Sequence, residues 1–360
     1  MNKDFKRILV TGGAGFIGGA LIRKLFSESN AIIFNLDKLS YSSDLSFLNY
    51  IPKEEVKKRH KLLKVDLCDS NSVKNAIRES DPDLVFHLAA ESHVDRSIDS
   101  PEKFINTNIN GTFNLLESLL EHFKLLEDFR KKNFKLIHVS TDEVFGSLDE
   151  NNYFDEKTNY EPTSPYSASK AASDHLAKAW YKTYGLPIII TNCSNNYGPY
   201  QFPEKLIPLV INKALNKKPI PIYGDGMNVR DWLYVEDHVD ALILVALKGN
   251  IGESFCIGGR EEKTNKEIVE TICCSLDELA PKEFSHKKLI NFVEDRPGHD
   301  YRYSINPAHI ETELGWYPNY SFKEALQKTI KWYLKNQAWH NLIVEKSGYQ
   351  GERLGKTKFL

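Results

Sequence analysis

The chain is poor in cysteine and has no long apolar run. It holds five cysteines in 360 residues, and no two of them have CxxC spacing. An odd number without paired spacing argues against a disulfide framework and predicts a reducing, cytoplasmic environment. No apolar stretch approaches ~20 residues, so no membrane-spanning helix is expected. The N-terminus also lacks the apolar core of a signal peptide.

An excess of charge of either sign is missing as well. The chain has 47 basic and 49 acidic residues. Proteins that bind nucleic acid or anionic membranes usually carry a basic excess, so neither partner is expected. There is no internal repeat or low-complexity segment, and no metal site is predicted. The length suits one large domain or two closely packed ones.

What the sequence does contain is an alternation of short apolar strands with helical patterns. Strands are expected at 7–10, 31–36, 62–65, 84–88 and 134–139. This alternation predicts an α/β fold with a doubly wound, parallel sheet of the Rossmann type. After Asn196 it gives way to Pro- and Gly-rich segments between short helices, which predicts a smaller, mixed α/β substrate-binding lobe.

A glycine-rich turn follows the first expected strand. Residues 11–18 read TGGAGFIG and fit both GxGxxG and GxxGxxG. Such a turn lets the backbone approach a pyrophosphate and offers amide donors at a helix N-terminus. Asp37 ends the second strand, where an acid binds ribose hydroxyls and repels a 2′-phosphate. The pattern favours NAD over NADP, a preference that Lys38 weakens slightly. The alternative is an ordinary glycine turn with a surface aspartate.

Ser140, Thr141, Asp142 and Glu143 come directly after the apolar run 134–139. Parallel sheets bind ligands at the carboxyl ends of their strands, so these side chains can reach a substrate. Two adjacent carboxyls in a half-buried cleft do not ionise equally easily, so one can donate a proton while the other acts as a base. The alternative is a solvated helix cap, because Thr-Asp-Glu is common at helix starts.

Tyr166 and Lys170 lie on a helix expected to begin at Ser164-Pro165, since proline favours the first helical position. A spacing of four residues puts both side chains on one face. A nearby ammonium stabilises a phenolate, which can take the proton of a substrate hydroxyl. YxxxK alone occurs by chance in many helices, but it is informative after a nucleotide fold and a strand-end Ser/Thr.

These motifs resemble the extended short-chain dehydrogenases/reductases, and more narrowly the dTDP-glucose 4,6-dehydratases of the nucleotide-sugar pathway to deoxysugars such as rhamnose. The resemblance spans Ile8 to about Trp332. The Asp142-Glu143 pair is its specific part, because the sister epimerases carry small or neutral residues there. Phe145 stands where the family usually has Tyr, and only a packing change is expected. The matching segments are 88–97, 140–146, 166–175, 192–200 with 203–208, 230–238 and 295–303.

The resemblance implies an NAD-dependent hydro-lyase. It would convert dTDP-glucose to dTDP-4-keto-6-deoxyglucose and water by oxidation at C4, elimination across C5–C6 and hydride return to C6. A nucleotide-sugar 4-epimerase of the same fold, a dehydratase for another nucleotide base and a non-catalytic NAD sensor remain the alternatives. Family members usually form homodimers through the helices that begin near Thr107 and Ser164. Buried core or a dimer seam would explain Leu115, Leu116, Leu119 and Leu120 equally well.

The resemblance also assigns catalytic roles. Tyr166 would take the proton of the glucosyl 4-hydroxyl, Lys170 would stabilise its phenolate, and Thr141 would hydrogen-bond the 4-oxygen. Glu143 would remove the C5 proton as general base. Asp142, kept protonated, would donate to the departing 6-hydroxyl.

By resemblance, NAD would lie against the glycine turn, the end of the second strand and the small residues after the fourth strand. Asp66 and Leu67 would contact the adenine, and Asn196 the nicotinamide side. The residues expected to bind NAD are Gly12, Gly15, Phe16, Ile17, Gly18, Asp37, Lys38, Leu39, Ser40, Asp66, Leu67, Leu88, Ala89, Ala90, Ser92, Thr107, Tyr166, Lys170 and Asn196.

By resemblance, the second half of the chain would hold most of the substrate. Its diphosphate and nucleoside would be held by Lys205, Arg230, Asn265, Arg296 and His299. Arginine forks match phosphate oxygens bidentately, although a cation without context is more often a solvated surface residue. Pro221, Ile222 and Tyr223 would wall the thymine. The expected substrate contacts are Ser92, Thr141, Asn195, Lys205, Leu206, Pro221, Ile222, Tyr223, Arg230, Asn265, Asp295, Arg296, His299 and Tyr349. Residues 1–190 with about 226–257 would form the NAD-binding domain, and about 191–225 with 258–360 the nucleotide-sugar-binding lobe.

Overall fold

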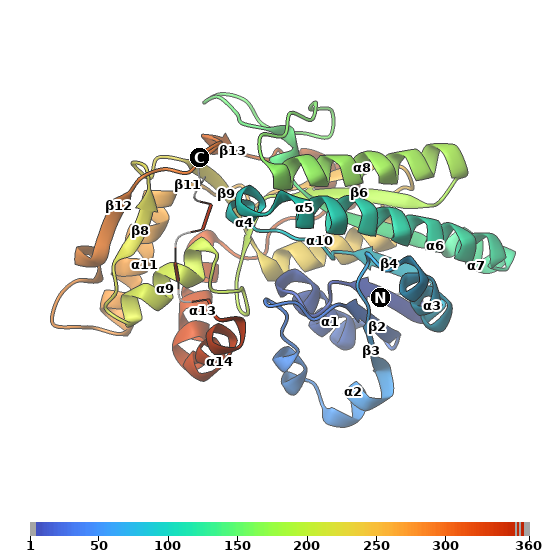
Figure 1. The fold of residues 1–360 in the computed structure, drawn as a ribbon, viewed down its shortest axis with the longest axis horizontal. Helices are drawn as coiled ribbons and strands as arrows, with labels where there is room; N and C mark the ends of the chain where they lie inside the picture. Colours follow the sequence, from blue (N-terminus) through green and yellow to red (C-terminus); the bar gives the residue numbers. More distant parts are fainter. Residues whose placement is uncertain (1–4, 350, 353, 356–360) are drawn as a thin grey trace.

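A computed structural model describes residues 5–349, 351, 352, 354 and 355. Its larger body is built on seven parallel strands in the order β10-β6-β5-β4-β1-β2-β3 (Figure 1). The order reverses between β1 and β4, as in a doubly wound sheet, so the predicted fold class is confirmed. The strands are β1 Arg7–Thr11, β2 Ile32–Asp37, β3 His60–Lys64, β4 Leu84–His87, β5 Lys135–Thr141, β6 Ile188–Cys193 and β10 Ser254–Ile257.

Helices cover both faces of this sheet, which is why its strands are apolar on both sides. On one face α1 (Phe16–Glu28) and α10 (Val235–Lys248) pack together, and on the other α3 (Ser70–Ser80), α6 (Gly111–Leu125) and α8 (Pro165–Tyr184). The core interpretation of the α6 leucines is confirmed, and they are not a dimer seam: all of them are buried, namely Leu115, Leu116, Leu119 and Leu120. Other helices of this body include α2 Lys53–Arg59, α4 Val94–Asp99 and α7 Asp128–Asn133, with the 3-10 turn η1 Ser46–Tyr50.

The helix that we placed near Thr107 begins earlier than its sequence indicated. α5 (Pro101–Phe104) continues through one π-helical segment, η2 (Ile105–Asn110), into α6. Pro101 occupies the first turn, where a missing N–H costs no hydrogen bond. π-helical turns often occur at functional sites, and Thr107 lies within this one.

The smaller lobe contains two small sheets, and Figure 1 shows it on the left of the large sheet. In the four-stranded sheet β9 pairs with β7, β11 and β13, and in the two-stranded sheet β8 pairs with β12. The elements are β7 Asn195–Tyr197, α9 Leu206–Leu215, β8 Ile220–Tyr223, β9 Val229–Tyr234, β11 Glu262–Thr264, α11 Asn265–Leu279, η4 His286–Leu289, β12 Ile290–Val293, β13 Arg302–Tyr303, α13 Phe322–Lys335 and α14 Gln337–Ser347. The short helix α12 Ala308–Leu314 packs instead on β10 and α10 of the larger body.

The chain crosses between the two bodies several times. Within the segment of about 226–257, β9 pairs with strands of the small sheet, whereas α10 packs on α1 and β10 extends the large sheet. The predicted domain boundaries remain a proposal. No helix in the described part of the chain has the length and apolarity needed to cross a bilayer.

Candidate active site

A cleft opens where the strand ends of the large sheet meet the smaller lobe. Its walls include the residues at or just beyond the ends of β2, β4, β5 and β6, together with the turn after β1 and the lobe segment 194–207. All the predicted catalytic residues line it. All the predicted NAD-binding residues line it too, except Leu39, whose backbone N–H donates to Asp37 in the turn after β2.

Thr141 both caps a short helix and faces the cleft. The backbone N–H of Glu143 donates to Thr141 Oγ1 over 3.3 Å at the start of the 3-10 turn η3 (Asp142–Phe145). The helix-cap interpretation is therefore right about the cap but wrong about solvation, because Thr141 and Asp142 are buried at the cleft. Phe145 is buried against Phe154 and Tyr160, in agreement with a packing change only.

The two carboxyls of the pair have different surroundings. Asp142 is fully buried, and its Oδ2 has no partner among the described residues. Burial raises the pKa of Asp142 well above its ordinary value, and the nearby Glu143 carboxylate raises it further. Burial also raises the pKa of Glu143, but three cations oppose the rise, in the order Arg296, Lys205 and Arg230. These surroundings favour a protonated Asp142 beside an ionised Glu143.

Tyr166 and Lys170 face the same cleft from α8. Ser164 caps this helix through Ser167 and so fixes its first turn. Burial raises the pKa of Tyr166 well above its ordinary value, and the Glu143 carboxylate adds to the rise. The Lys170 ammonium is buried and donates to the Val139 carbonyl over 3.0 Å. Burial thus outweighs the expected stabilisation of the phenolate.

The glycine turn has the shape that a dinucleotide needs. α1 has no side-chain cap at Gly15, so its first amides are left for another acceptor. Gly12 has φ +71°, and a Cβ there would lie 2.7 Å from the Ala89 nitrogen. A Cβ on Gly18 would lie 2.2 Å from the Gly12 oxygen. The residues present therefore fit NAD.

We expect Gly18→Ala to weaken NAD binding by about tenfold or more, because the added methyl must push the turn away from its present path. The amount of NAD that stays with the protein through gel filtration, measured after denaturation, checks this result. NAD retention equal to that of the unchanged protein would contradict the role of the turn.

The end of β2 is arranged for an unphosphorylated ribose. Asp37 accepts hydrogen bonds from Ala14 N, Leu39 N and Ser43 Oγ. A carboxylate has about four acceptor sites, so capacity remains for a ribose hydroxyl. Lys38 pairs with Glu91 over 2.8 Å. Its charge is therefore compensated by a carboxylate, so Lys38 no longer weakens the expected preference for NAD over NADP.

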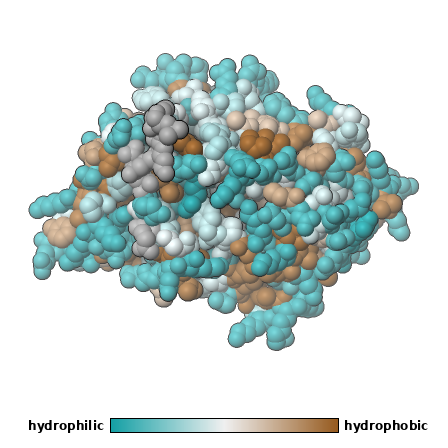
Figure 2. All heavy atoms as spheres, in the orientation of Figure 1, coloured by the Kyte–Doolittle hydropathy of each residue, from teal (hydrophilic) through white to brown (hydrophobic). Residues whose placement is uncertain are grey.

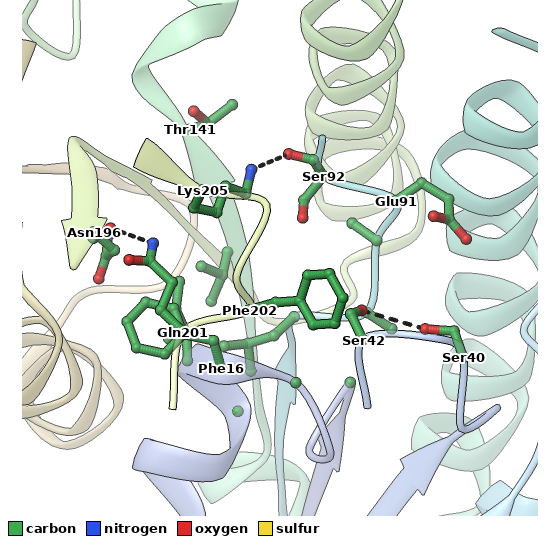
Figure 3. Close-up of a pocket in the computed structure, with 18 of the residues that line it drawn as sticks. Phe16, Ser40, Ser42, Glu91, Ser92, Thr141, Asn196, Gln201, Phe202 and Lys205 are labelled. Atoms are coloured by element: carbon green, nitrogen blue, oxygen red, sulfur yellow. Dashed lines mark hydrogen bonds between the residues drawn. The ribbon is translucent and has the colours of Figure 1, made fainter. Parts of the chain in front are cut away.

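The predicted substrate residues near the cleft centre lie where expected. Ser92, Thr141, Asn195, Lys205 and Leu206 all line the cleft. Figure 3 shows Lys205 reaching the backbone oxygen of Ser92, a contact of 2.8 Å, with Thr141 nearby.

A second cavity adjoins the cleft through Glu204, which lines both. Pro221, Tyr223 and Tyr349 line this cavity, as predicted for a nucleoside wall. The side chain of Ile222 is instead buried in the lobe core, which corrects our prediction. Side chains alternate along a strand, so Pro221 and Tyr223 on β8 face the cavity and Ile222 faces away.

The other predicted substrate residues lie outside the linings of both cavities. Arg230 donates to the carbonyls of Val229, Asp300 and Tyr301 and stacks on Tyr303. His299 pairs with Asp295 over 2.7 Å, and burial lowers the pKa of His299 to about 4, so its ring is neutral near pH 7. Arg296 pairs with Asp95 over 2.6 Å. Asn265 begins α11, and its N–H donates to Asn228.

Sequence reasoning missed several residues that line the cleft. Trp232 packs in the lobe core and also lines the cleft, and its buried Nε1 has no partner among the described residues. Its position on β9 beside the matched Arg230 was a signal. Figure 3 shows Gln201 and Phe202 in the cleft as well. The missed residues are Tyr41, Ser42, Ser43, Glu91, Cys193, Ser194, Gln201, Phe202, Glu204, Ile207 and Trp232.

Known proteins match this chain over nearly its whole length. The family model for GDP-mannose 4,6 dehydratase matches residues 9–329. A probable dTDP-glucose 4,6-dehydratase of Sinorhizobium fredii is 52% identical, covering 97% of this chain and 98% of that protein. The dTDP-glucose 4,6-dehydratase of Neisseria meningitidis is 50% identical, covering 98% of this chain and 100% of that protein.

Solved structures of dTDP-glucose 4,6-dehydratases and of epimerases have the same fold as this chain. DesIV, a dTDP-glucose 4,6-dehydratase of Streptomyces venezuelae with NAD and dTDP bound, is 40% identical with a TM-score of 0.84, covering 94% of this chain and 99% of that chain. The UDP-glucose 4-epimerase of Thermus thermophilus with NAD is 29% identical with a TM-score of 0.78, covering 92% of this chain and 99% of that chain. Fold alone does not separate the two activities, but identity over the full length favours the first. This chain belongs to the family of the dTDP-glucose 4,6-dehydratases.

Proposed function

We infer that the protein is an NAD-dependent hydro-lyase that converts dTDP-glucose to dTDP-4-keto-6-deoxyglucose and water, a step of deoxysugar nucleotide biosynthesis. The observation that carries this inference is the single cleft that brings a buried acid, a second carboxyl and a Tyr–Lys pair together beside a glycine turn. Membership in the family supports the same reaction.

The oxidation half of the reaction belongs to the residues of α8 and β5. When bound, NAD⁺ would accept the hydrogen removed from C4 and return it at C6, and its cationic ring would favour a phenolate. It would be held by the glycine turn, the end of β2, residues 66–67 and 88–90, Thr107 and Asn196. Tyr166 takes the proton of the 4-hydroxyl, Lys170 supports the charge that develops, and Thr141 orients the 4-oxygen.

The elimination half belongs to the acid pair. The 4-keto group acidifies the C5 proton, and Glu143 removes it as general base. Asp142 gives its proton to the departing 6-hydroxyl, so water leaves and the double bond forms between C5 and C6. Burial raises the pKa of both carboxyls, but the three cations near Glu143 oppose the rise there, so Glu143 ionises more readily than Asp142. The opposite environments of two adjacent carboxyls supply both groups at one pH.

These environments predict a bell-shaped pH dependence of kcat/KM. Activity rises with pH as Glu143 loses its proton, because a base must be ionised. It falls at higher pH as Asp142 loses its proton, because an acid must hold one. Burial raises both pKa values, so both limbs should lie above the ordinary carboxyl range. Since the two groups are coupled, the limbs belong to the pair. A rate independent of pH between 4 and 9, as an approximate window, would contradict the assignment.

One assay separates this function from its alternatives. The protein is incubated with dTDP-glucose and, in parallel, with the UDP, GDP and CDP sugars. Products with a 4-keto-6-deoxy sugar absorb in strong alkali, whereas an epimerase gives no such product and a sensor leaves the sugar unchanged. We expect absorbance with dTDP-glucose above all others. Absorbance with none of them would overturn the proposal.

We also propose a homodimer and a cytoplasmic location. Exposed apolar side chains on the α5–α8 face support the dimer: Ile105 and Phe113 are both exposed, and Phe113 contacts Trp180 edge-on. Figure 2 shows hydrophobic residues interrupting the hydrophilic cover in the upper part of the view, where Figure 1 places α5, α6 and α8. The location rests on the five cysteines, each of which is a free thiol. Light scattering measures the oligomeric state.

A further inference from the structure

Helix α4 of the larger body carries two consecutive residues of opposite charge that both reach the smaller lobe. Asp95 Oδ1 lies 2.6 Å from Nη1 of Arg296. Arg96 Nε lies 2.7 Å from Oε2 of Glu204. Each charge therefore meets its opposite on a different lobe segment: Glu204 lies just before α9, and Arg296 lies between β12 and β13. The short helix is fixed against both segments at once.

These ion pairs are shielded from solvent. The exposed fractions of the side chains are 8% for Asp95, 14% for Arg296 and 4% for Glu204, while Arg96 keeps 30%. Exposed ion pairs contribute little, whereas removing one partner of a buried pair leaves an uncompensated charge. Additional contacts brace both acids: the Tyr223 hydroxyl donates to Asp95 and the Tyr41 hydroxyl to Glu204.

Both pairs act on cations expected to meet the diphosphate. Arg296 is one of these cations, and Lys205, which follows Glu204, is another. Asp95 engages Nη1 of Arg296, while the buried Nε has no partner among the described residues. A guanidinium has five donors in a planar fork, so a side chain held at one end still offers donors to a phosphate oxygen. Lys205 in turn donates to the carbonyl of Ser92, close to α4 in sequence.

We propose that Asp95 and Arg96 are positioning residues that set Arg296 and Lys205 in place for the substrate diphosphate. Asp95 acts directly on Arg296, and Arg96 acts on Lys205 through Glu204. The inference rests on the proposed function, because Arg296 and Lys205 meet a diphosphate only if the substrate is the nucleotide sugar of that reaction. If Asp95 and Arg96 only joined the two bodies, replacing them would lower stability but would affect the binding of dTDP and of thymidine equally.

The test uses the full-length protein with NAD. Asp95→Asn and Arg96→Gln should each raise the KM for dTDP-glucose by about tenfold, with kcat changed by less than about threefold. Inhibition by dTDP should weaken by a similar factor, whereas inhibition by thymidine, which has no phosphate, should stay unchanged. Arg96→Lys, which keeps the charge, should recover part of the loss. Asp128→Asn is the matched control, since Asp128 is an exposed aspartate on α7 that lines neither cavity and should leave all constants unchanged.

Two further variants separate the possible failures. If Lys205→Ala and Arg296→Ala leave the KM unchanged, the diphosphate contacts of the proposed function are wrong. If those two raise the KM but Asp95→Asn and Arg96→Gln do not, only the positioning role fails. Equal weakening of inhibition by dTDP and by thymidine would also overturn the positioning role. A lower KM for Asp95→Asn would overturn it too, because Asp95 would then compete with the phosphate for Arg296. Melting temperatures identify any variant that does not fold.

Discussion

Replacing Glu143 with glutamine is expected to reduce formation of the 4-keto-6-deoxy product by ~10²–10⁴, the usual effect of losing one acid–base partner. Glutamine keeps the size and hydrogen-bonding reach of the side chain but cannot accept the C5 proton. Oxidation at C4 uses Tyr166 and not Glu143, so the variant should still reduce NAD⁺ and then stall. Reduced cofactor, seen by its near-ultraviolet absorbance, should build up while alkali-absorbing product does not.

The neighbouring carboxyl provides the matched comparison. Asp142→Asn removes the proton donor but leaves the base, so in deuterated water it should still exchange the C5 proton while expelling little water. Glu143→Gln should lose that exchange. Glu150→Gln changes an exposed glutamate outside the cleft and should leave the rate as it is. Dehydration by Glu143→Gln at near the unchanged rate would show that the base lies elsewhere.

Tyr166→Phe is expected to lower the rate by a similar ~10²–10⁴, but at the earlier step. Phenylalanine fills the same buried space and lacks only the hydroxyl that takes the proton of the sugar 4-hydroxyl. Because oxidation comes first, this variant should build up neither reduced cofactor nor product. Rapid mixing with dTDP-glucose under single-turnover conditions measures both signals.

A second tyrosine on the same helix serves as control. Tyr184 lies at the exposed end of α8, so Tyr184→Phe should turn over normally. If Tyr166→Phe built up reduced cofactor as Glu143→Gln does, Tyr166 would not be the base of the oxidation. The pair of variants thus tests the order of the two half-reactions as well as the two roles.

Local sequence patterns predicted most of the residues that line the candidate site. The glycine turn, the acid pair after β5 and the Tyr166–Lys170 face each depend on a few consecutive residues, and each lies in the cleft. The start of α8 at Pro165 likewise follows from Ser164 and the residues just after it. Such features are encoded within one turn or one strand end, where backbone geometry and side-chain chemistry act together.

Other features depend on contacts between distant segments. The side chain of Ile222 points into the lobe core because β8 pairs with β12, a strand much later in the chain. This pairing decides which face of β8 is buried. Burial of Lys170 and Tyr166, which shifts their pKa values, results from the packing of α8 against β5, β6 and η3. The role of Glu204 could not be predicted from its own segment, because it depends on hydrogen bonds from Tyr41 and Arg96 of the larger body.

The sequence by itself was enough to predict the fold class, the cofactor and the candidate reacting groups, because each depends on short motifs whose spacing has one favourable geometry. Only the tertiary structure decided which strand β9 joins, which leucines of α6 are core, and how α4 meets the smaller lobe. These depend on pairings between segments tens to hundreds of residues apart. Such pairings are selected by packing and charge across the whole molecule, and no local pattern records them.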